Sequence, residues 1–353
     1  MIALGHEVTF AHIERELGDR DAMKTFWGDR YRPIAYPSEH RVQRSLIQRA
    51  LKRLGLSNPH NYRLDDFYSE SVNSQLQALA EEISPQVAWV EYVFMSAALL
   101  NFPDSVWRIV DTHDVFSDRY KRFLSQGQKP QWFSTSAKEE KQGLSRADAV
   151  VAIQSLEAEF FRNLGLKNVV TLGDFVPLTA PSPTRNQVPG SLLLVGSANS
   201  SNVHSAEYFI KQCLPIIKKE VPGVELMVVG GLSKELQPQQ GVRLLGRVEN
   251  LDDCYSQAQV VINPVQFGSG LKIKTMEALG FARALVTTQL GGEGLEDGWH
   301  SAFCVADTAP LFAAAVVQLL QDKQGREALE NRAFEYARRT NQNNVQMLEK
   351  LLG

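Results

Sequence analysis

Residues 263–280 read NPVQFGSGLKIKTMEALG, and this stretch decides the fold because a glycine-rich loop in it joins a strand to a helix. The apolar run Val260–Ile262 just before it predicts a buried strand, and the helix is predicted to begin near Leu271. Small residues let a ligand approach the backbone closely, and the free N–H groups of a helix's first turn favour an anion. The pattern therefore predicts a parallel α/β sheet with an anion site at the end of one strand.

Two charged side chains of this helix indicate what the anion is. Lys272 falls in the first turn, where a cation opposes the helix dipole unless a phosphate lies between them. Glu277 lies seven residues after Gly270, on nearly the same helix face, and a carboxylate is a natural acceptor for two sugar hydroxyls. We therefore expect a diphosphate on Gly268, Ser269, Gly270 and Lys272, with a ribose on Glu277. The alternative is an ordinary surface helix with an i, i+3 ion pair.

Short apolar runs alternate with amphipathic stretches along the whole chain, as in parallel sheets built from βαβ units. A proline-rich segment divides them into two series, so we expect a first domain over 1–175, a linker over 176–190, a second domain over 191–335 and a helical tail over 336–353. The expected strands are Val8–Phe10, Val87–Val93, Arg108–Val110, Ala149–Ile153 and Val169–Thr171, then Leu192–Val195, Glu225–Val229, Val242–Leu245, Val260–Ile262 and Ala284–Thr287.

The chain opens inside a predicted helix. Leu4 and Gly5 read as a helix end and its glycine cap, followed at once by a strand. A doubly wound domain normally has a strand and a glycine-rich turn before such a helix. We therefore expect the first strand to be missing, either because the chain is truncated or because its natural start lacks that strand.

Composition excludes several classes of protein. The chain has 353 residues, 44% of them hydrophobic and 22% charged, and its net charge of −3 does not favour nucleic acid. Cys213, Cys254 and Cys304 are widely spaced, which argues against disulfides and zinc and fits a reducing compartment. No apolar run approaches the roughly 18 residues of a membrane span, and the N-terminus does not read as a signal peptide. The expected location is cytoplasmic.

One segment is strongly basic. Eight basic residues and one acid lie between Arg30 and Arg63, and apolar residues recur at helical spacing among them. The simpler interpretation of the predicted helix over 41–53 is a solvated surface helix. The sharper one is a surface that docks on anionic lipid or on a phosphorylated acceptor, and contact with lipid would place the protein peripherally at the inner face of the membrane.

Several motifs of the second domain occur together in one known family, densely over 192–296. This set resembles the family 4 (group 1) type of GT-B glycosyltransferases, in which two Rossmann-like domains have parallel sheets facing across a cleft. The matching residues are Gly268, Gly270, Lys272, Lys274, Glu277 and Gly280, then Val286–Thr288 and Gly291–Leu295, with Val195–Ser197, Asn202 and Gly246–Val248 upstream.

The resemblance implies a role for each matching position. Glu277 would hold the ribose and Lys272 the diphosphate, while the helix over 336–353 would pack back on the first domain. Ser269 stands where many members have a glutamate, and the loop after Val195 is neutral where many have a cation. Both departures bear on sugar recognition. At the sugar end, the backbone N–H groups of Gly291 and Gly292 would face the donor, and Gly196 and Ser197 would border its cleft.

The candidate catalytic residues of the first domain follow the predicted strand Arg108–Val110, where functional residues of open α/β sheets gather. The family places a histidine at such a position, facing the donor sugar, and His113 matches it, with Asp114 as its neighbour. The histidine would hydrogen-bond a sugar hydroxyl and support an oxocarbenium-like transition state. The alternative is a structural histidine satisfied by Asp111 or Asp114.

Other acids of the first domain are weaker candidates. Glu91, at the end of a predicted strand, is a candidate near the acceptor, whereas Glu139 and Glu140 read as a solvated helix face. No histidine shows metal-ligand spacing and no carboxylate pair stands out at a strand end, so we expect no metal.

The resemblance implies a reaction that transfers a hexosyl group, with retention, from a nucleoside diphosphate sugar to a glycan or lipid-linked acceptor, as in polysaccharide biosynthesis. The donor is a substrate, and no cofactor is expected. The alternatives are a nucleotide-sugar isomerase of GT-B architecture and a degenerate nucleotide-binding protein without turnover. An NAD-dependent enzyme is disfavoured because no GxGxxG motif follows a strand with an acid about 20 residues on.

Overall fold

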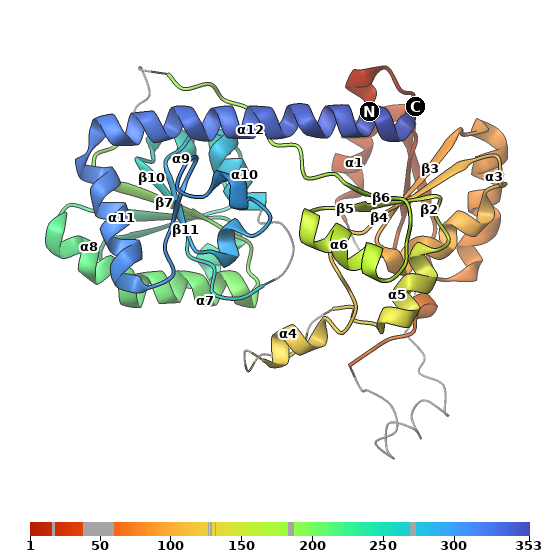
Figure 1. Ribbon diagram of the computed structural model, residues 1–353, viewed down its shortest axis with the longest axis horizontal. Helices are drawn as coiled ribbons and strands as arrows, with labels where there is room; N and C mark the ends of the chain where they lie inside the picture. Colours follow the sequence, from red (N-terminus) through yellow and green to blue (C-terminus); the bar gives the residue numbers. More distant parts are fainter. Residues whose placement is uncertain are drawn as a thin grey trace, which may run out of the picture. The chain divides into compact units, whose positions relative to one another are not determined.

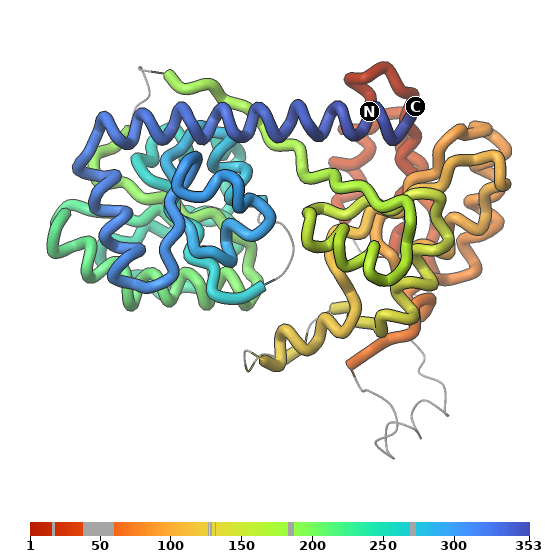
Figure 2. The backbone as a smooth tube through the Cα atoms, viewed as in Figure 1, coloured from red at the N-terminus to blue at the C-terminus, as the bar shows by residue number. Residues whose placement is uncertain are grey.

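The computed structural model describes residues 1–15, 18–37, 60–125, 127, 129–130, 132–182, 187–268 and 273–353. The chain divides into a first unit, residues 1–172 with 346–353, and a second unit, residues 173–345. Each unit contains parallel strands joined by helices (Figure 1). Figure 2 traces the same path from the red N-terminus to the blue C-terminal helix. The predicted α/β class with parallel sheets in separate domains is confirmed.

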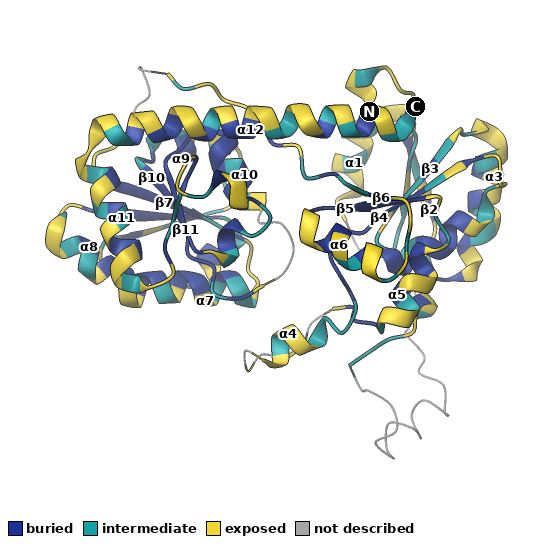
Figure 3. Ribbon diagram, in the orientation of Figure 1, coloured by how far each residue is buried: buried dark blue, intermediate teal, exposed yellow. Residues whose placement is uncertain are grey.

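The second unit is built on one parallel sheet in the order β12-β11-β10-β7-β8-β9. Alternate residues of central strand β7 enter different cores: Leu192 and Leu194 join one, Leu193 the other. Both faces of the sheet are thus covered, which explains why these strands read as unbroken apolar runs. Figure 3 shows the inner strands β7, β8, β10 and β11 mostly in dark blue, as buried. Their bounds are β7 Ser191–Val195, β8 Glu225–Val229, β9 Val242–Gly246, β10 Val260–Asn263, β11 Leu285–Thr287 and β12 Cys304–Val305.

Two groups of helices cover the two faces of this sheet. One core includes residues of α7, α8 and α11, and the other includes residues of α9, α10 and α12. Asn199 caps α7 by accepting from the Asn202 N–H at 2.8 Å, and Asn250 caps α9 in the same way. The bounds are α7 Ser200–Tyr208, α8 Leu214–Glu220, α9 Leu251–Gln257, α10 Ile273–Gly280, α11 Ala309–Gln321 and α12 Lys323–Leu352.

The first unit contains a parallel sheet in the order β3-β4-β5-β6 and a separate parallel pair, β1 with β2. On β4, Val110 packs into a core with Leu144 and Phe161, whereas Ile109 faces a second core that includes Leu348 of α12. The bounds are β1 Phe10–Ile13, α1 Arg20–Trp27, β2 Tyr31–Ile34, α3 Asn73–Ile83, β3 Val87–Glu91, β4 Trp107–Asp111, α4 Tyr120–Leu124, α5 Ala137–Leu144, β5 Ala149–Ala152, α6 Ser155–Asn163 and β6 Val169–Thr171.

The boundary between the units falls between residues 172 and 173, before the linker expected over 176–190. Val176 is buried in a core of the second unit, and its N–H and carbonyl pair with the Asn341 side chain at 3.2 and 2.8 Å. The start of the proline-rich segment is therefore part of the second unit. The tail expected over 336–353 belongs to one longer helix, α12, of which only 346–353 cluster with the first unit.

Near the N-terminus the structure has the expected glycine cap: Ile2–Leu4 form one helical turn that ends at Gly5, whose φ is 88°. The following strand begins at Phe10 rather than Val8. The basic segment 41–53 lies outside the described residues. Within the described ranges, no helix combines the length and the apolar character needed to span a membrane.

Candidate functional site

The carboxyl ends of β7, β10 and β11 meet at one edge of the second unit's sheet, because these strands are parallel neighbours. Loops leave this edge after Val195, Asn263 and Thr287. Ligands of open α/β sheets bind at such an edge. The structure thus brings together most of the predicted donor-binding positions. Gly196, Ser197, Gly268, Gly291 and Gly292 follow these strands, while Ser269, Gly270 and Lys272 lie outside the described residues.

A buried hydrogen-bond network fixes the turn after β11 against the start of α10. Thr275 Oγ1 donates to the Gly291 carbonyl at 2.7 Å and accepts from Asn263 Nδ2 at 3.0 Å. Thr287 Oγ1 donates to the Asn263 carbonyl at 2.8 Å. Buried polar groups are costly unless they are paired, and these side chains pair with one another and with the backbone. The network therefore holds the loop rigidly before any ligand binds.

The N–H groups of Gly291 and Gly292 donate hydrogen bonds within this turn. The Gly291 N–H donates to Thr288 Oγ1 and the Gly292 N–H to the Thr288 carbonyl, both at 3.0 Å. Each N–H group therefore already has an acceptor within the turn, and a contact of these glycines with a sugar stays a prediction. Gly291 is required for a different reason: a Cβ there would overlap Thr287 Oγ1.

Lys274 brings a positive charge to this edge from the first turn of α10. Its ammonium donates to Asn202 Oδ1 at 2.5 Å. Asn202 Nδ2 in turn donates to the carbonyl and the hydroxyl of Ser197, at 2.8 and 3.1 Å. The lysine is thereby held toward the loop after β7. The sequence predicts the diphosphate on Lys272, which lies outside the described residues; Lys274 is a described cation of the same helix.

Glu277 follows Lys274 by three residues on α10 and is partly buried. Its Oε2 accepts a hydrogen bond from the Tyr255 hydroxyl at 2.9 Å. Burial raises the pKa of Glu277, while the bond from Tyr255 and the charge of Lys274 lower it. An ionised carboxylate has more acceptor positions than this one bond uses, so it can also accept from the hydroxyls of a ligand.

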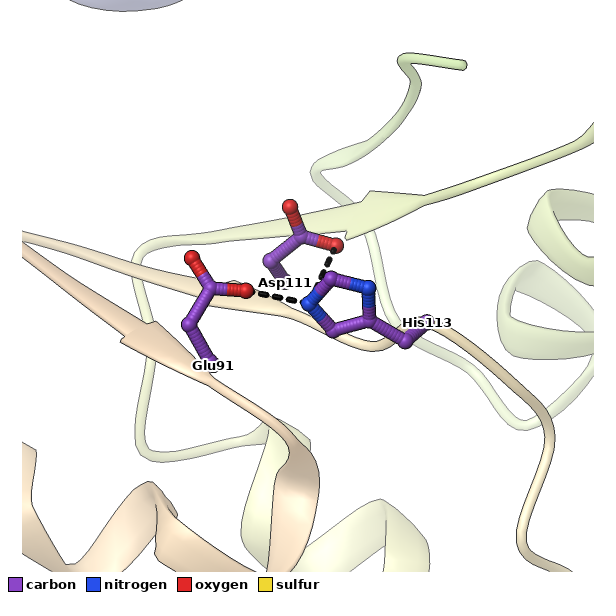
Figure 4. A group of neighbouring side chains, drawn as sticks. All are labelled: Glu91, Asp111 and His113. Atoms are coloured by element: carbon purple, nitrogen blue, oxygen red, sulfur yellow. Dashed lines mark hydrogen bonds and ion pairs between the residues drawn. The ribbon is translucent and has the colours of Figure 1, made fainter. Parts of the chain in front are cut away.

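His113 lies at the carboxyl edge of the first unit's sheet. Glu91 and Asp111 are register partners on β3 and β4, so their side chains share one face. Figure 4 shows both carboxylates near the same ring nitrogen: His113 Nε2 pairs with Glu91 and lies 3.9 Å from Asp111 Oδ1. His113 also has a left-handed φ of 58°, which is uncommon outside glycine and clusters at functional sites. Glu91, the weaker candidate, is thus a direct partner of the histidine.

These three side chains also form a group of described residues that offers metal ligands. Their ligand atoms all lie within 4.8 Å of one another, and one imidazole nitrogen with two carboxylate oxygens suits zinc or manganese. An N–H at Nε2 of His113 can equally donate to Glu91 with no metal present. The geometry therefore accommodates a metal without requiring one.

Asp114 is engaged differently from its neighbour. It is buried, and its carboxylate accepts from Arg119 Nε at 2.7 Å and Arg122 Nη1 at 3.3 Å. Two guanidinium groups thus occupy its two oxygens. These ion pairs tie α4 to the end of β4, and a catalytic role of Asp114 stays a prediction.

Two buried acids near Asp114 were not expected from the sequence. Glu140 is fully buried and accepts from the N–H groups of Phe116 and Ser117, each at 2.7 Å, so its assignment to a solvated face is wrong. Burial raises its pKa to about 7. Glu157, in the first turn of α6, is 5% exposed, and burial together with Asp114 raises its pKa to about 8. The spacing of residues along the chain does not predict that either side chain is buried.

The second unit is similar in sequence to known proteins. Residues 189–322 match the family model described as Glycosyl transferases group 1. A Klebsiella pneumoniae protein, named as an uncharacterized 44.6 kDa protein in the cps region, is 24% identical over 159 residues, which cover 41% of this chain and 41% of that protein. The chain thus matches less than half of that relative's length.

Solved structures resemble the whole chain more weakly in sequence but clearly in fold. S. aureus TarM, solved with UDP, has a TM-score of 0.60 at 12% identity, covering 80% of this chain and 59% of TarM. The pneumococcal O-GlcNAc transferase GtfA, solved with UDP and GlcNAc, has 0.59 at 15%, covering 78% and 59%. Anabaena HepE, solved with UDP and glucose, has 0.58 at 13%, covering 97% and 99%. The chain therefore has the GT-B fold, and its second unit matches the glycosyl transferases group 1 model.

Proposed function

We propose that the protein transfers a hexosyl group from a nucleoside diphosphate sugar to a hydroxyl of a glycan or lipid-linked acceptor. The observation that carries the proposal is the pair of charged residues on α10, Lys274 tied to the loop after β7 and Glu277 tied to Tyr255. An ammonium suits a diphosphate and a carboxylate suits ribose hydroxyls. The group 1 match over the same residues and the UDP in TarM, GtfA and HepE support a nucleotide sugar as donor.

In the proposed reaction, the bond between the anomeric carbon and the diphosphate oxygen breaks as the acceptor oxygen bonds to that carbon. The acceptor's proton passes to the departing diphosphate. Lys274, together with Lys272, stabilises the charge on the leaving group, and Glu277 holds the ribose. Displacement on one face of the sugar retains its configuration without a carboxylate nucleophile, which agrees with the pairing of Asp114 with two arginines.

We further propose that the acceptor is met at the inner face of the membrane. The basic segment 41–53, which lies outside the described residues, supplies cations that attract anionic lipid. This contact would bring a lipid-linked acceptor to the first unit.

Replacing His113 with alanine is expected to lower kcat by about 100-fold and to leave nucleotide affinity unchanged. The reason is that we assign His113 to the reacting sugar and the nucleotide to α10 of the second unit. Turnover and calorimetric binding of UDP measure the two effects. His300→Ala is the control, because His300 also has a left-handed φ, 57°, and is an exposed residue to which we assign no role. If His113→Ala had the same kcat as the wild type, His113 would have a structural role only.

Chelation of divalent ions with EDTA is expected to leave the rate unchanged, because in this scheme lysine and the helix dipole stabilise the leaving group. The comparison is the initial rate with and without EDTA. A rate that EDTA abolishes and Mn²⁺ restores would contradict this and point to Glu91, Asp111 and His113 as a metal centre.

The test of the proposed function is incubation with UDP-, GDP-, ADP- and TDP-sugars, with and without a hydroxyl acceptor. Acceptor-dependent release of nucleoside diphosphate supports transfer, and the anomeric proton coupling of the product reports retention. Conversion of one nucleotide sugar into another without release would instead indicate an isomerase. Binding of the nucleotide without any conversion would indicate a binding protein.

A further inference from the structure

Tyr255 lies in the core of the second unit, beneath the proposed ribose-binding carboxylate. It is 1% exposed, and its ring stacks on Phe281 with centroids 4.2 Å apart and planes 12° apart. Its hydroxyl donates to Glu277 Oε2 at 2.9 Å. Because the ring is fixed in this way, the hydroxyl stays in one position, within hydrogen-bond distance of the Glu277 carboxylate.

We infer that Tyr255 is a positioning residue for nucleotide binding, which orients the Glu277 carboxylate so that it accepts the ribose hydroxyls. The inference rests on the proposed function, in which Glu277 binds ribose. Phenylalanine would fill this core position without a hydroxyl to satisfy, and a buried hydroxyl costs free energy unless it is hydrogen-bonded. The hydroxyl at position 255 is therefore explained by Glu277 and not by packing.

The hydroxyl also acts on the charge of Glu277. Burial raises the pKa of Glu277, and the hydrogen bond from Tyr255 is the larger of the two effects that oppose it, ahead of the charge of Lys274. A protonated carboxyl group loses acceptor capacity and so suits ribose less well. Of the titratable groups acting on Glu277, Tyr255 comes from α9 and Lys274 from its own helix, while Cys254 acts on Tyr255.

A fully buried arginine, Arg283, binds the backbone of Tyr255. Arg283 Nη1 donates to the carbonyls of Tyr255 and Ala258, at 3.4 and 3.2 Å, and lies 3.6 Å from Glu330 Oε1. These carbonyls lie at the end of α9, where the helix leaves such groups without helical partners. The arginine thus holds the end of α9, and α9 holds the phenol against Glu277.

The test is Tyr255→Phe, which keeps the ring and removes only the hydroxyl. The dissociation constants of UDP, GDP, ADP and TDP for the wild type are measured by calorimetry from about pH 5 to about pH 9. The nucleotide that binds most tightly is then titrated into each variant over the same pH range. Affinity is expected to fall about 3- to 10-fold near pH 8. As the pH is lowered, affinity is also expected to be lost at a higher pH than in the wild type, because the pKa of Glu277 rises without the hydroxyl.

The matched control is Tyr336→Phe, since Tyr336 is a second buried phenol of this unit and donates to a carboxylate, Asp297, at 2.5 Å. It is expected to keep the wild-type pH profile. In a double-mutant cycle with Glu277→Gln, the effects of the two changes are expected to be less than additive.

The two proposals fail in different ways. If the wild type binds none of the four nucleotides, the proposed function fails. If Glu277→Gln weakens binding while Tyr255→Phe binds like the wild type at every pH, only the role of Tyr255 is overturned. Equal loss in both tyrosine variants, with no shift of the pH profile, also overturns it, because that result describes general loss of stability.

Discussion

Replacing Glu277 with glutamine is expected to weaken nucleoside diphosphate binding by about 10- to 100-fold, the range for losing hydrogen bonds to a charged group. Glutamine retains the volume of the side chain and one carbonyl oxygen, which can still accept from Tyr255. What it loses is the charge and the second acceptor, so a ribose presenting two hydroxyls would be held by one at most. The measurement is calorimetric titration with UDP, GDP, ADP and TDP near pH 8.

Glu225→Gln is the matched control, because Glu225 is a partly exposed glutamate at the start of β8, at the opposite end of the strand from its carboxyl edge. Its nucleotide affinity is expected to equal that of the wild type. If Glu277→Gln bound nucleotide with the wild-type affinity and had an unchanged melting temperature, that result would contradict the proposed sugar transfer.

The second large effect concerns stability: Glu157→Gln is expected to make the protein more stable than the wild type at alkaline pH. The pKa of Glu157 is about 8 in the folded protein, against an ordinary value of 4.5. Between these values the folded state holds a proton that the unfolded state has lost, so wild-type stability falls as the pH rises from 4.5 to 8. At about 1.4 kcal/mol per unit, the loss is on the order of 5 kcal/mol. Glutamine does not titrate and avoids it.

Thermal unfolding followed by circular dichroism from about pH 5 to about pH 9 measures this difference. The melting temperatures of the two proteins are expected to diverge through this range and to run parallel above pH 8, where both states are ionised. Glu159→Gln is the control, since Glu159 is exposed on the same helix. Parallel curves for the wild type and Glu157→Gln over the whole range would show that Glu157 is ionised in the folded protein.

The sheet of the second unit could be predicted from the sequence because its strands are buried on both faces. Such strands appear as short apolar runs between turns, and β8 has the predicted bounds while β7 begins one residue early. Glu277 could be placed on α10 for a similar reason, since helix periodicity fixes which residues share a face. Its partner Tyr255 could not, because their contact joins two helices.

The acids of the first unit show the limit of local pattern. Glu140 looks like one of several charged residues on a helix, yet its carboxylate is paired with backbone N–H groups 23 and 24 residues earlier in the chain. Likewise, Glu91 becomes a partner of His113 only through the parallel register that aligns Glu91 with Asp111. Pairings of this kind depend on which strands become neighbours, and the spacing of residues along the chain does not contain that information.

The threonine network beside β11 has a thermodynamic consequence for substrate choice. With Asn263, Thr275 and Gly291 already bonded to one another, the turn has little conformational freedom left to lose when a donor arrives. Under the proposed function, a donor sugar that fits this turn would bind with a small entropic penalty. A sugar of another shape would fit only if buried hydrogen bonds broke, so the turn would select donors by steric exclusion.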